Sequence, residues 1–276
     1  MRINTNISAL QAQRAMAEHS KTVESSSGKL SSGSRVRNAS DDAASLAIGQ
    51  KNKAEIRSQH AAMRNANDAV SEFQVAEGAM GEMGNMLVRL RELSMQAATA
   101  TLEDSDRSLL NMEYMELRQE IERITRSTEF NGTKVLRSGS GSNRDFQIGI
   151  QHDANSTLSI KENDLTLTEF NLRIVDSSIP NAEEAKMNLQ YIDEAINKLS
   201  GTRAKVGSLQ NRLMSAVGNL EVSKTNEMEA LSKRMDADYA LETSEKLKAE
   251  GKLAAATSVL AQSNLFSAQT LKLLKD

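Results

Sequence analysis

Apolar residues recur at alternating intervals of three and four positions over most of the chain, the spacing of one helix face. The clearest run follows Pro180, where Asn181 and Glu184 form an N-x-x-E capping signal. We therefore predict a long coiled-coil helix that ends near Asp236, followed by a last helix that runs nearly to Asp276. The predicted seam of the first of these helices holds Leu189, Ile192, Ile196, Leu199, Arg203, Val206, Gln210, Leu213, Val217, Leu220, Lys224, Glu227 and Leu231.

The amino-terminal region carries a weaker helical seam. Ala9, Met16, Val23 and Leu30 recur every seven residues, but the partner positions between them are small or polar. The stretch from residue 25 to residue 40 is rich in Ser and Gly, which break helices and build turns. It predicts a joint between the first helix and the next one.

A longer helix is predicted from residue 43 to residue 100. Ser40 is its expected N-cap, with Asp41 and Asp42 in the first turn, where the helix dipole favours carboxylates. Methionines from Met80 to Met95 lie on its apolar stripes, and at this spacing we interpret them as core residues rather than a binding groove.

A shorter helix is predicted after a polar break at residues 101–105, with Asn131-Gly132 as its stop. From residue 135 to residue 178 the helical pattern ends, and apolar residues alternate in two short runs with loose flanks, which is typical of strands. Residues 146–150 and 158–160 predict a β-hairpin with a turn at 153–155. The segment from Ser138 to Asn143 reads as a flexible loop, and its serines are candidates for attached sugar.

Composition supports slender helical layers rather than a thick globular core. Aromatic residues make up 3% of the chain, there is one Pro, and Cys and Trp are absent. The absence of Cys excludes disulfides and thiolate metal sites. The net charge of −3 predicts no nucleic-acid partner, and no apolar stretch reaches the roughly 20 residues that cross a bilayer.

No chemistry of catalysis is evident in the sequence. The three histidines, His19, His60 and His152, lie far apart, and no phosphate-binding, nucleophile-elbow or zinc-protease motif occurs. The paired aspartates at 41–42 and at 236 and 238 are explained as capping and solvated charges. We therefore expect no enzyme, no cofactor and no metal.

The helical stripes are too narrow to be buried by one chain alone. We expect the two chain ends to pack on each other and on neighbouring copies. Their Ala- and Ser-rich seams bury little apolar area against the entropy of ordering, so we expect them to be disordered in the monomer and to order on association. Association that repeats along an axis through heterologous contacts makes a filament.

Several long motifs resemble bacterial flagellin. At the amino-terminal end these are INTNISALQAQR, GKLSSGSRVRNASDDAASLAI, RNANDAVSEFQVAEGAMGEMGNMLVRLREL and STEFNGTKVL; at the other end they are RAKVGSLQNRL, SKRMDADYALE and VLAQSN. The resemblance covers roughly residues 1–136 and 190–276. Only residues 137–189 separate these regions, which leaves no room for the outer domains of larger family members.

The resemblance implies a mainly α fold of long antiparallel coiled-coil helices, with the N- and C-terminal helices paired and a small β-hairpin region in the middle. It implies an inner-tube domain of residues 1–40 and 237–276 and an outer-tube domain of residues 41–236, with its β region at about 131–178. The implied function is a self-assembling subunit of the flagellar filament. A hook–filament junction protein and an intracellular coiled-coil scaffold remain as alternatives.

The resemblance also implies partners and contact residues. Arg89, Leu93 and Glu113 match family positions that form a contact between subunits and a surface read by an innate immune receptor of animals. An Arg and a Leu four residues apart share one helix face, a pairing suited to an interface. Other implied partners are the export apparatus and its chaperone, the filament cap and the hook-junction proteins. The implied location is the extracellular filament, reached without a cleaved signal peptide.

Overall fold

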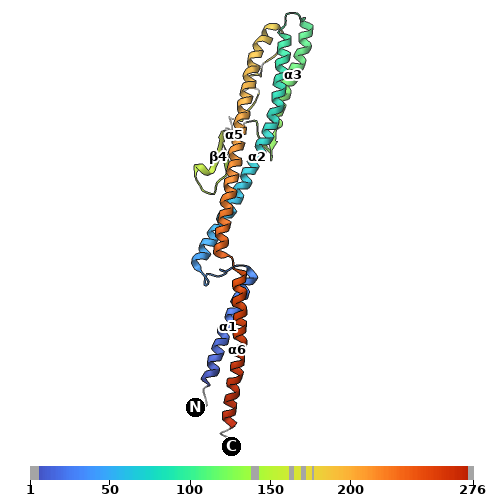
Figure 1. The fold of residues 1–276 in the computed structure, drawn as a ribbon. Helices are drawn as coiled ribbons and strands as arrows, with labels where there is room; N and C mark the ends of the chain where they lie inside the picture. Colours follow the sequence, from blue (N-terminus) through green and yellow to red (C-terminus); the bar gives the residue numbers. More distant parts are fainter. Residues whose placement is uncertain (1–5, 138–142, 162–164, 169–171, 176, 273–276) are drawn as a thin grey trace. The chain divides into compact units, whose positions relative to one another are not determined.

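The chain forms two compact units, and it is mainly α-helical, as predicted. One unit, called here the terminal unit, comprises residues 1–56 and 225–276; the other, the central unit, comprises residues 57–224. Figure 1 shows the computed structural model. It describes residues 6–137, 143–161, 165–168, 172–175 and 177–272.

The terminal unit pairs the two ends of the chain. Helix α1 (Ile7–Ser32) lies side by side with helix α6 (Tyr239–Lys272) (Figure 1). Asn6 caps α1 by accepting from the backbone N–H of Ala9, and its amide donates to the carbonyl of Ser263 on α6. Lys29 forms an ion pair of 2.7 Å with Glu242. The predicted pairing of the terminal helices is confirmed.

The predicted joint at residues 25–40 begins too early. Helix α1 continues through the serine run to Ser32 and ends at Gly33, whose left-handed φ of 66° suits a residue without Cβ. Ser26 is buried within this helix. Tertiary packing therefore overrides the weak helix preference of these serines.

Helix α2 (Ala43–Ala97) begins later than its expected cap. The N-cap is Asp42, whose carboxylate accepts from the backbone N–H of Ser45 at 2.9 Å, and not Ser40. The Asp41 carboxylate instead accepts from the backbone N–H groups of Arg37 and Asn38 and holds the preceding turn. Ser40, Asp41 and Asp42 are all residue types that can cap a helix. Because Asp41 is hydrogen bonded within the preceding turn, Asp42 is the residue that caps α2.

The central unit packs α2 against helix α3 (Asp104–Ser127) and helix α5 (Ala182–Met235). Helices α2 and α5 continue past the unit's boundaries into the terminal unit. The α2 stripe is buried as predicted, including Phe73, Met80, Met83, Leu87 and Leu90. The interpretation of the methionines as core residues is confirmed for Met80 and Met83 but is wrong for Met95, which is 54% exposed near the end of the helix.

Helix α5 starts where its capping signal predicts. Asn181 accepts from the backbone N–H of Glu184 and donates to the Glu184 carboxylate. Of the expected seam positions, Ile192, Leu199, Val206 and Leu213 are buried and the others are half-buried or exposed. At the alternate positions the buried residues are one place earlier, namely Asn188, Ala195 and Thr202 in place of Leu189, Ile196 and Arg203.

Asn131-Gly132 is a hairpin turn rather than a helix stop. Helix α3 already ends at Ser127, where the N–H of Thr128 bonds to the carbonyl of Ile124. Strands β1 (Glu129–Phe130) and β2 (Thr133–Lys134) then pair across Asn131 and Gly132, whose φ values are 49° and 77°. An Asn-Gly pair with positive φ at both positions is the signature of a two-residue hairpin turn.

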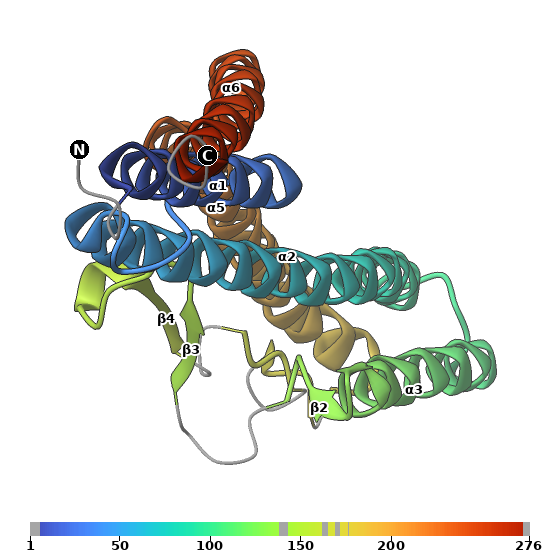
Figure 2. The same ribbon diagram turned by 90° about the horizontal axis from the view of Figure 1, so that it is seen from below.

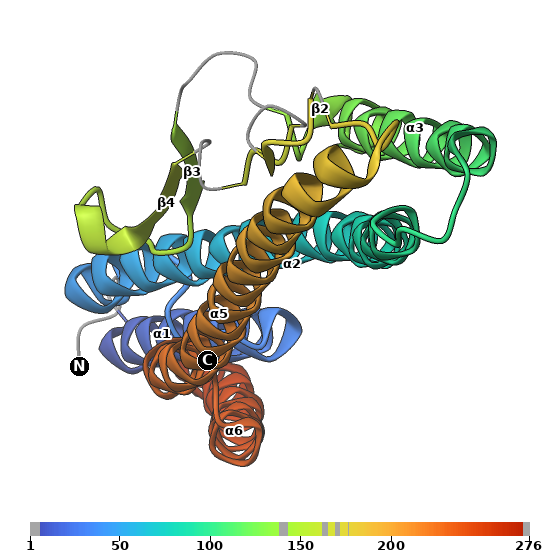
Figure 3. The same cartoon turned by 90° about the horizontal axis from the view of Figure 1, so that it is seen from above.

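The predicted β-hairpin is confirmed. Strands β3 (Asn143–Gln147) and β4 (Thr157–Lys161) are antiparallel, with Phe146 opposite Leu158, and a short 3₁₀ helix, η1 (Ala154–Ser156), lies at the predicted turn. Figures 2 and 3 show the hairpin beside α2, where the Phe73 and Phe146 rings meet edge to face at 5.8 Å. The serine loop at 138–142 lies outside the described residues.

Candidate subunit interface

Arg89 and Glu113 meet on the surface of the central unit because α2 and α3 fold back on each other. The Arg89 Nη2 lies 2.7 Å from the Glu113 Oε1, and its Nη1 lies 3.3 Å from Glu92. The side chains of Arg89 and Glu113 are 49% and 44% exposed. The hydrogen bond to Glu113 raises the pKa of the Arg89 guanidinium, which therefore keeps its positive charge.

Leu93 does not share this exposed surface. Its side chain is 1% exposed and belongs to the core formed by α2, α3 and α5. Arg89 and Glu113 can therefore contact a partner directly, whereas Leu93 can influence such a contact only by holding α2 in place. The drift of the buried stripe along a helix as long as α2 carries Leu93 inward, which a spacing of four residues alone does not reveal.

Arg107 fixes the connection between α2 and α3. Its Nε donates to the carbonyl of Ala97 at 3.0 Å and its Nη2 to the carbonyl of Thr99 at 2.9 Å, while Nη1 pairs with Asp104. Because Arg107 satisfies carbonyls at the carboxyl end of α2, it sets where that helix ends and how α3 returns. Sequence reasoning missed this residue, since nothing in the pattern distinguishes it from an exposed arginine.

Short backbone contacts join the two linkers of the terminal unit. The N–H of Arg35 donates to the carbonyl of Met235 at 2.7 Å, and the N–H of Ala237 donates to the carbonyl of Gly33 at 2.9 Å. The Ser34 hydroxyl and the Arg35 guanidinium also donate to carbonyls at the end of α5. These bonds fasten the chain entering α2 to the chain leaving α5, so the two terminal helices start from a common point.

The α1–α6 pair leaves many of its apolar side chains in water. The buried apolar residues of the terminal unit, within the described residues, are Ala9, Ala12, Val36, Met235 and Ala249. Large exposed ones include Leu247, 67% exposed, and Leu265, 65% exposed; the others are Ile7, Leu10, Ile48, Met228, Tyr239, Leu241 and Val259. Helices with this much exposed apolar surface are suited to contact further chains.

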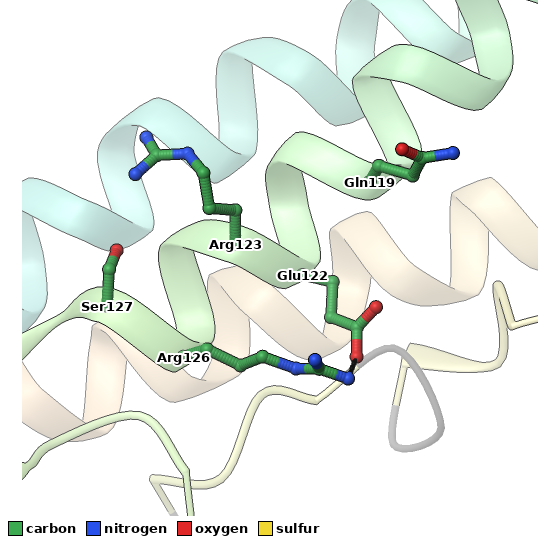
Figure 4. Close-up of a pocket in the computed structure, with 5 residues that line it drawn as sticks. All are labelled: Gln119, Glu122, Arg123, Arg126 and Ser127. Atoms are coloured by element: carbon green, nitrogen blue, oxygen red, sulfur yellow. Dashed lines mark hydrogen bonds and ion pairs between the residues drawn. The ribbon is translucent and has the colours of Figure 1, made fainter.

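A shallow depression of about 560 Å³ lies along one face of α3. Figure 4 shows Arg126 reaching back along the helix to Glu122, with which it forms an ion pair, while Gln119 and Arg123 point away from it. Arg123 pairs with Glu120 at 2.6 Å. Because both arginines are neutralised by acids of the same helix, the depression lacks an unpaired charge for a ligand.

The described residues contain no group of three His, Cys, Asp or Glu side chains that could hold a metal ion. None of the described helices has the length and apolar character to cross a membrane. His60 and His152 are exposed and His19 is half-buried.

Paired terminal helices that leave large apolar side chains exposed are suited to assembly with further chains. The family comparisons agree: residues 3–141 match the bacterial flagellin N-terminal helical region, and residues 189–274 match the bacterial flagellin C-terminal helical region. The chain belongs to the bacterial flagellin family.

Two relatives cover the full length of this chain. A flagellin of Halalkalibacterium halodurans is 35% identical over 275 residues, and the alignment covers 100% of both proteins. The flagellar filament 33 kDa core protein of Treponema phagedenis is 34% identical over 288 residues, again with 100% of both proteins covered.

Solved structures share the fold. The crystal structure of Bacillus cereus flagellin has a TM-score of 0.50 and 30% identity, and the match covers 57% of this chain and 88% of that one. A putative flagellar hook-associated protein from Vibrio parahaemolyticus has a TM-score of 0.60, with 71% and 100% coverage. Its identity of 15% shows the fold alone, so the junction-protein alternative is not favoured over flagellin.

Proposed function

We propose that this chain is a structural subunit of the bacterial flagellar filament, which it builds by self-assembly for swimming motility. The observation that carries the proposal is the full-length relationship to filament proteins at 34–35% identity. The exposed apolar side chains of α1 and α6 are consistent with it, since such a surface becomes dry when copies pack together. The role is structural rather than catalytic.

Seeded growth tests this function. Purified monomer, added to short fragments of its own filament, should elongate them into helical filaments visible by electron microscopy. An intracellular scaffold protein is not expected to elongate such seeds. A monomer that stays unpolymerised on fresh seeds, while remaining folded by circular dichroism, would exclude the filament role.

Ordering of the terminal helices on polymerisation is part of this proposal. The α1–α6 contact buries mainly alanine and serine, which contribute little against about 1–2 kcal/mol of backbone entropy per ordered residue. Helix content measured by circular dichroism should rise from monomer to polymer. Equal helix content in both states would contradict the proposal.

We also propose which residues form the inner and outer tubes of the filament and which residues contact other molecules. Residues 1–40 and 237–276 form the inner tube, and residues 41–236 the outer tube with the β region at about 131–178. Arg89 and Glu113 form part of an outer-tube contact between subunits and of a surface for an animal innate receptor, with Leu93 supporting them from the core. Surface charge, burial and family position support this assignment.

The remaining partners follow from membership of the family. We propose export through the flagellar apparatus with a chaperone, without a cleaved signal peptide, and contact with the filament cap and the hook-junction proteins. The homologous filaments are extracellular structures. Narrow helices, together with a chain that has no Cys, suit passage of the unfolded chain through a channel.

A further inference from the structure

The central unit separates positive from negative charge between two neighbouring helices. Residues 65–88 of α2 contain four acids, Asp68, Glu72, Glu77 and Glu82, and no Lys or Arg. Residues 195–220 of α5 contain four bases, Lys198, Arg203, Lys205 and Arg212, and no Asp or Glu. Elsewhere on this unit, the charges of α3 largely neutralise each other along the helix.

These two segments lie at the same level because α2 and α5 pack antiparallel. Gln210 donates to Glu77, and Arg91 pairs with Asp193 at 2.7 Å. The backbone of Gly84 packs close to the Leu199 side chain. The acidic segment of α2 therefore lies beside the basic segment of α5.

Part of this charge is already used within the chain. Glu72 forms a largely buried ion pair with Arg144 of the hairpin, and Glu77 accepts from Gln210. Asp68 and Glu82 on α2, and Arg212 on α5, are exposed and have no ion pair among the described residues. Lys205 is also exposed and lies seven residues before Arg212, on the same side of α5, whereas Arg203 lies nine residues before it, on the opposite side. Unpaired charges of opposite sign therefore remain on the two helices.

We propose that the acidic segment of α2 in one copy docks on the basic segment of α5 in the next copy, as a lateral contact of the filament. This inference rests on the proposed function and adds the surface and the polarity of the contact. Opposite charges across an interface favour the correct encounter, and like charges disfavour others. Contact of α2 with α2 or of α5 with α5 would bring like charges together, so a dimer in which either surface meets its own copy is disfavoured.

The polarity of this contact matters for assembly. Because the acidic segment and the basic segment are different surfaces of one subunit, each bound copy presents a free segment to the next. Such a heterologous contact stays open and continues, whereas a self-complementary contact closes after two copies. The charge separation thus favours a contact between unlike surfaces, which is the kind of contact that can continue from copy to copy.

Charge reversal of one segment should block growth. The variant Asp68→Lys/Glu82→Lys makes both surfaces basic, and Lys205→Glu/Arg212→Glu makes both acidic. Each should raise the critical concentration for elongation of its own seeds about tenfold, because several weak exposed pairs change sign together. Since exposed charges are screened, high salt should reduce the defect.

Restoring the complementarity gives the decisive test. The fourfold variant that combines both reversals exchanges the two charges and keeps the net charge of −3. It should elongate alone at close to the wild-type critical concentration, and an equimolar mixture of the two double variants should copolymerise. A fourfold variant no better than the worse double variant would overturn the proposal, as would double variants that elongate normally.

Two controls separate the possible causes of failure. Glu129→Lys/Glu183→Lys makes the same change in net charge at exposed positions outside both segments and away from Glu113, and should elongate normally; an equal defect there would overturn the pairing. Circular dichroism of each monomer checks folding, and Asp68→Asn/Glu82→Gln replaces any double variant that misfolds, with an intermediate defect expected. Wild-type protein that fails on its own seeds refutes the filament function itself, whereas failure of the exchange alone refutes only this contact.

Discussion

The central and terminal units differ in the size of the side chains that they bury between their helices. In the central unit, α2, α3 and α5 fully bury large side chains such as Phe73, Met80 and Leu90. In the terminal unit, the α1–α6 seam is made of Ala9, Ala12, Ser26 and Ala249, and the large apolar side chains lie outside it.

This difference indicates which state of the protein each unit stabilises. Full burial of one Leu, Phe or Met side chain contributes about 1.5–3 kcal/mol, so the central unit can hold its fold as a single chain. The terminal pair buries chiefly methyl groups and leaves its larger side chains for contacts with other copies. Substitutions in the two units should therefore affect different equilibria, namely folding of the monomer and assembly of the polymer.

The largest effect on the monomer is expected for Phe73→Ala. It removes a fully buried ring that packs against Phe146, and the cavity should lower the free energy of unfolding by about 3–5 kcal/mol. Urea unfolding followed by circular dichroism measures it. The matched control is Leu247→Ala, at a 67% exposed side chain, which should change monomer stability by less than about 0.5 kcal/mol yet weaken seeded growth. Equal losses of monomer stability would remove the distinction between the units.

Arg107→Ala should have the next largest effect. It deletes hydrogen bonds to the carbonyls of Ala97 and Thr99 at the end of α2, which predicts a loss of about 1–3 kcal/mol in the same urea experiment. Arg107→Lys keeps the charge but not the fork of donors, and should recover only part of the loss. Full recovery by Lys would show that charge alone matters at this position.

Regular helices and the hairpin could be predicted from the sequence because they follow from periodicity. The exceptions come from contacts between distant residues. Asn188 is buried on α5 because its amide donates to the carbonyl of Ser178 in the preceding segment, a contact that places a polar residue where the heptad pattern expects Leu189. Arg203 is exposed although the periodicity places it in the seam.

The candidate site shows the same limit. Proximity of Arg89 to Glu113 depends on how α3 folds back on α2, which the spacing of α2 alone does not contain. Leu93 was expected beside Arg89 as an apolar anchor, but the buried stripe rotates along α2 and includes it. The linker contacts of Ser34 and Arg35 with the end of α5 had no sequence signal, because most of their partners are backbone carbonyls.

A smaller, local effect is expected at acid pH in the terminal unit. Backbone N–H groups of Asn38 and Arg37 lower the pKa of Asp41, and hydrogen bonds from the Ser45 hydroxyl and N–H lower that of Asp42. Because both pKa values are lowered, the ionised carboxylates stabilise the start of α2 at pH values above the ordinary pKa of 3.8. This stabilisation is lost as the pH falls through the lowered pKa values of the folded protein.

Amide chemical shifts of Asn38 and Ser45 in the monomer should report this loss as the pH falls from about 5 to about 2. Asp41→Asn/Asp42→Asn keeps an oxygen acceptor at each position but does not titrate, so its shifts should stay flat. Shifts of the wild type that do not respond to pH would show that the carboxylates do not hold this turn.

The smallest effect on the monomer is expected for Arg89→Ala and Glu113→Ala. Both side chains are about half exposed, so their ion pair contributes little to folding, and urea unfolding should be unchanged within error. If the pair contacts a neighbouring subunit, each variant should slow seeded elongation. The double variant should then be no worse than the worse single one, because the two residues act as a unit.

Leu93→Ala is the contrast, since it should weaken the monomer through a core cavity and slow assembly only as a consequence. Normal elongation by both single surface variants would leave Arg89 and Glu113 as an ordinary exposed ion pair.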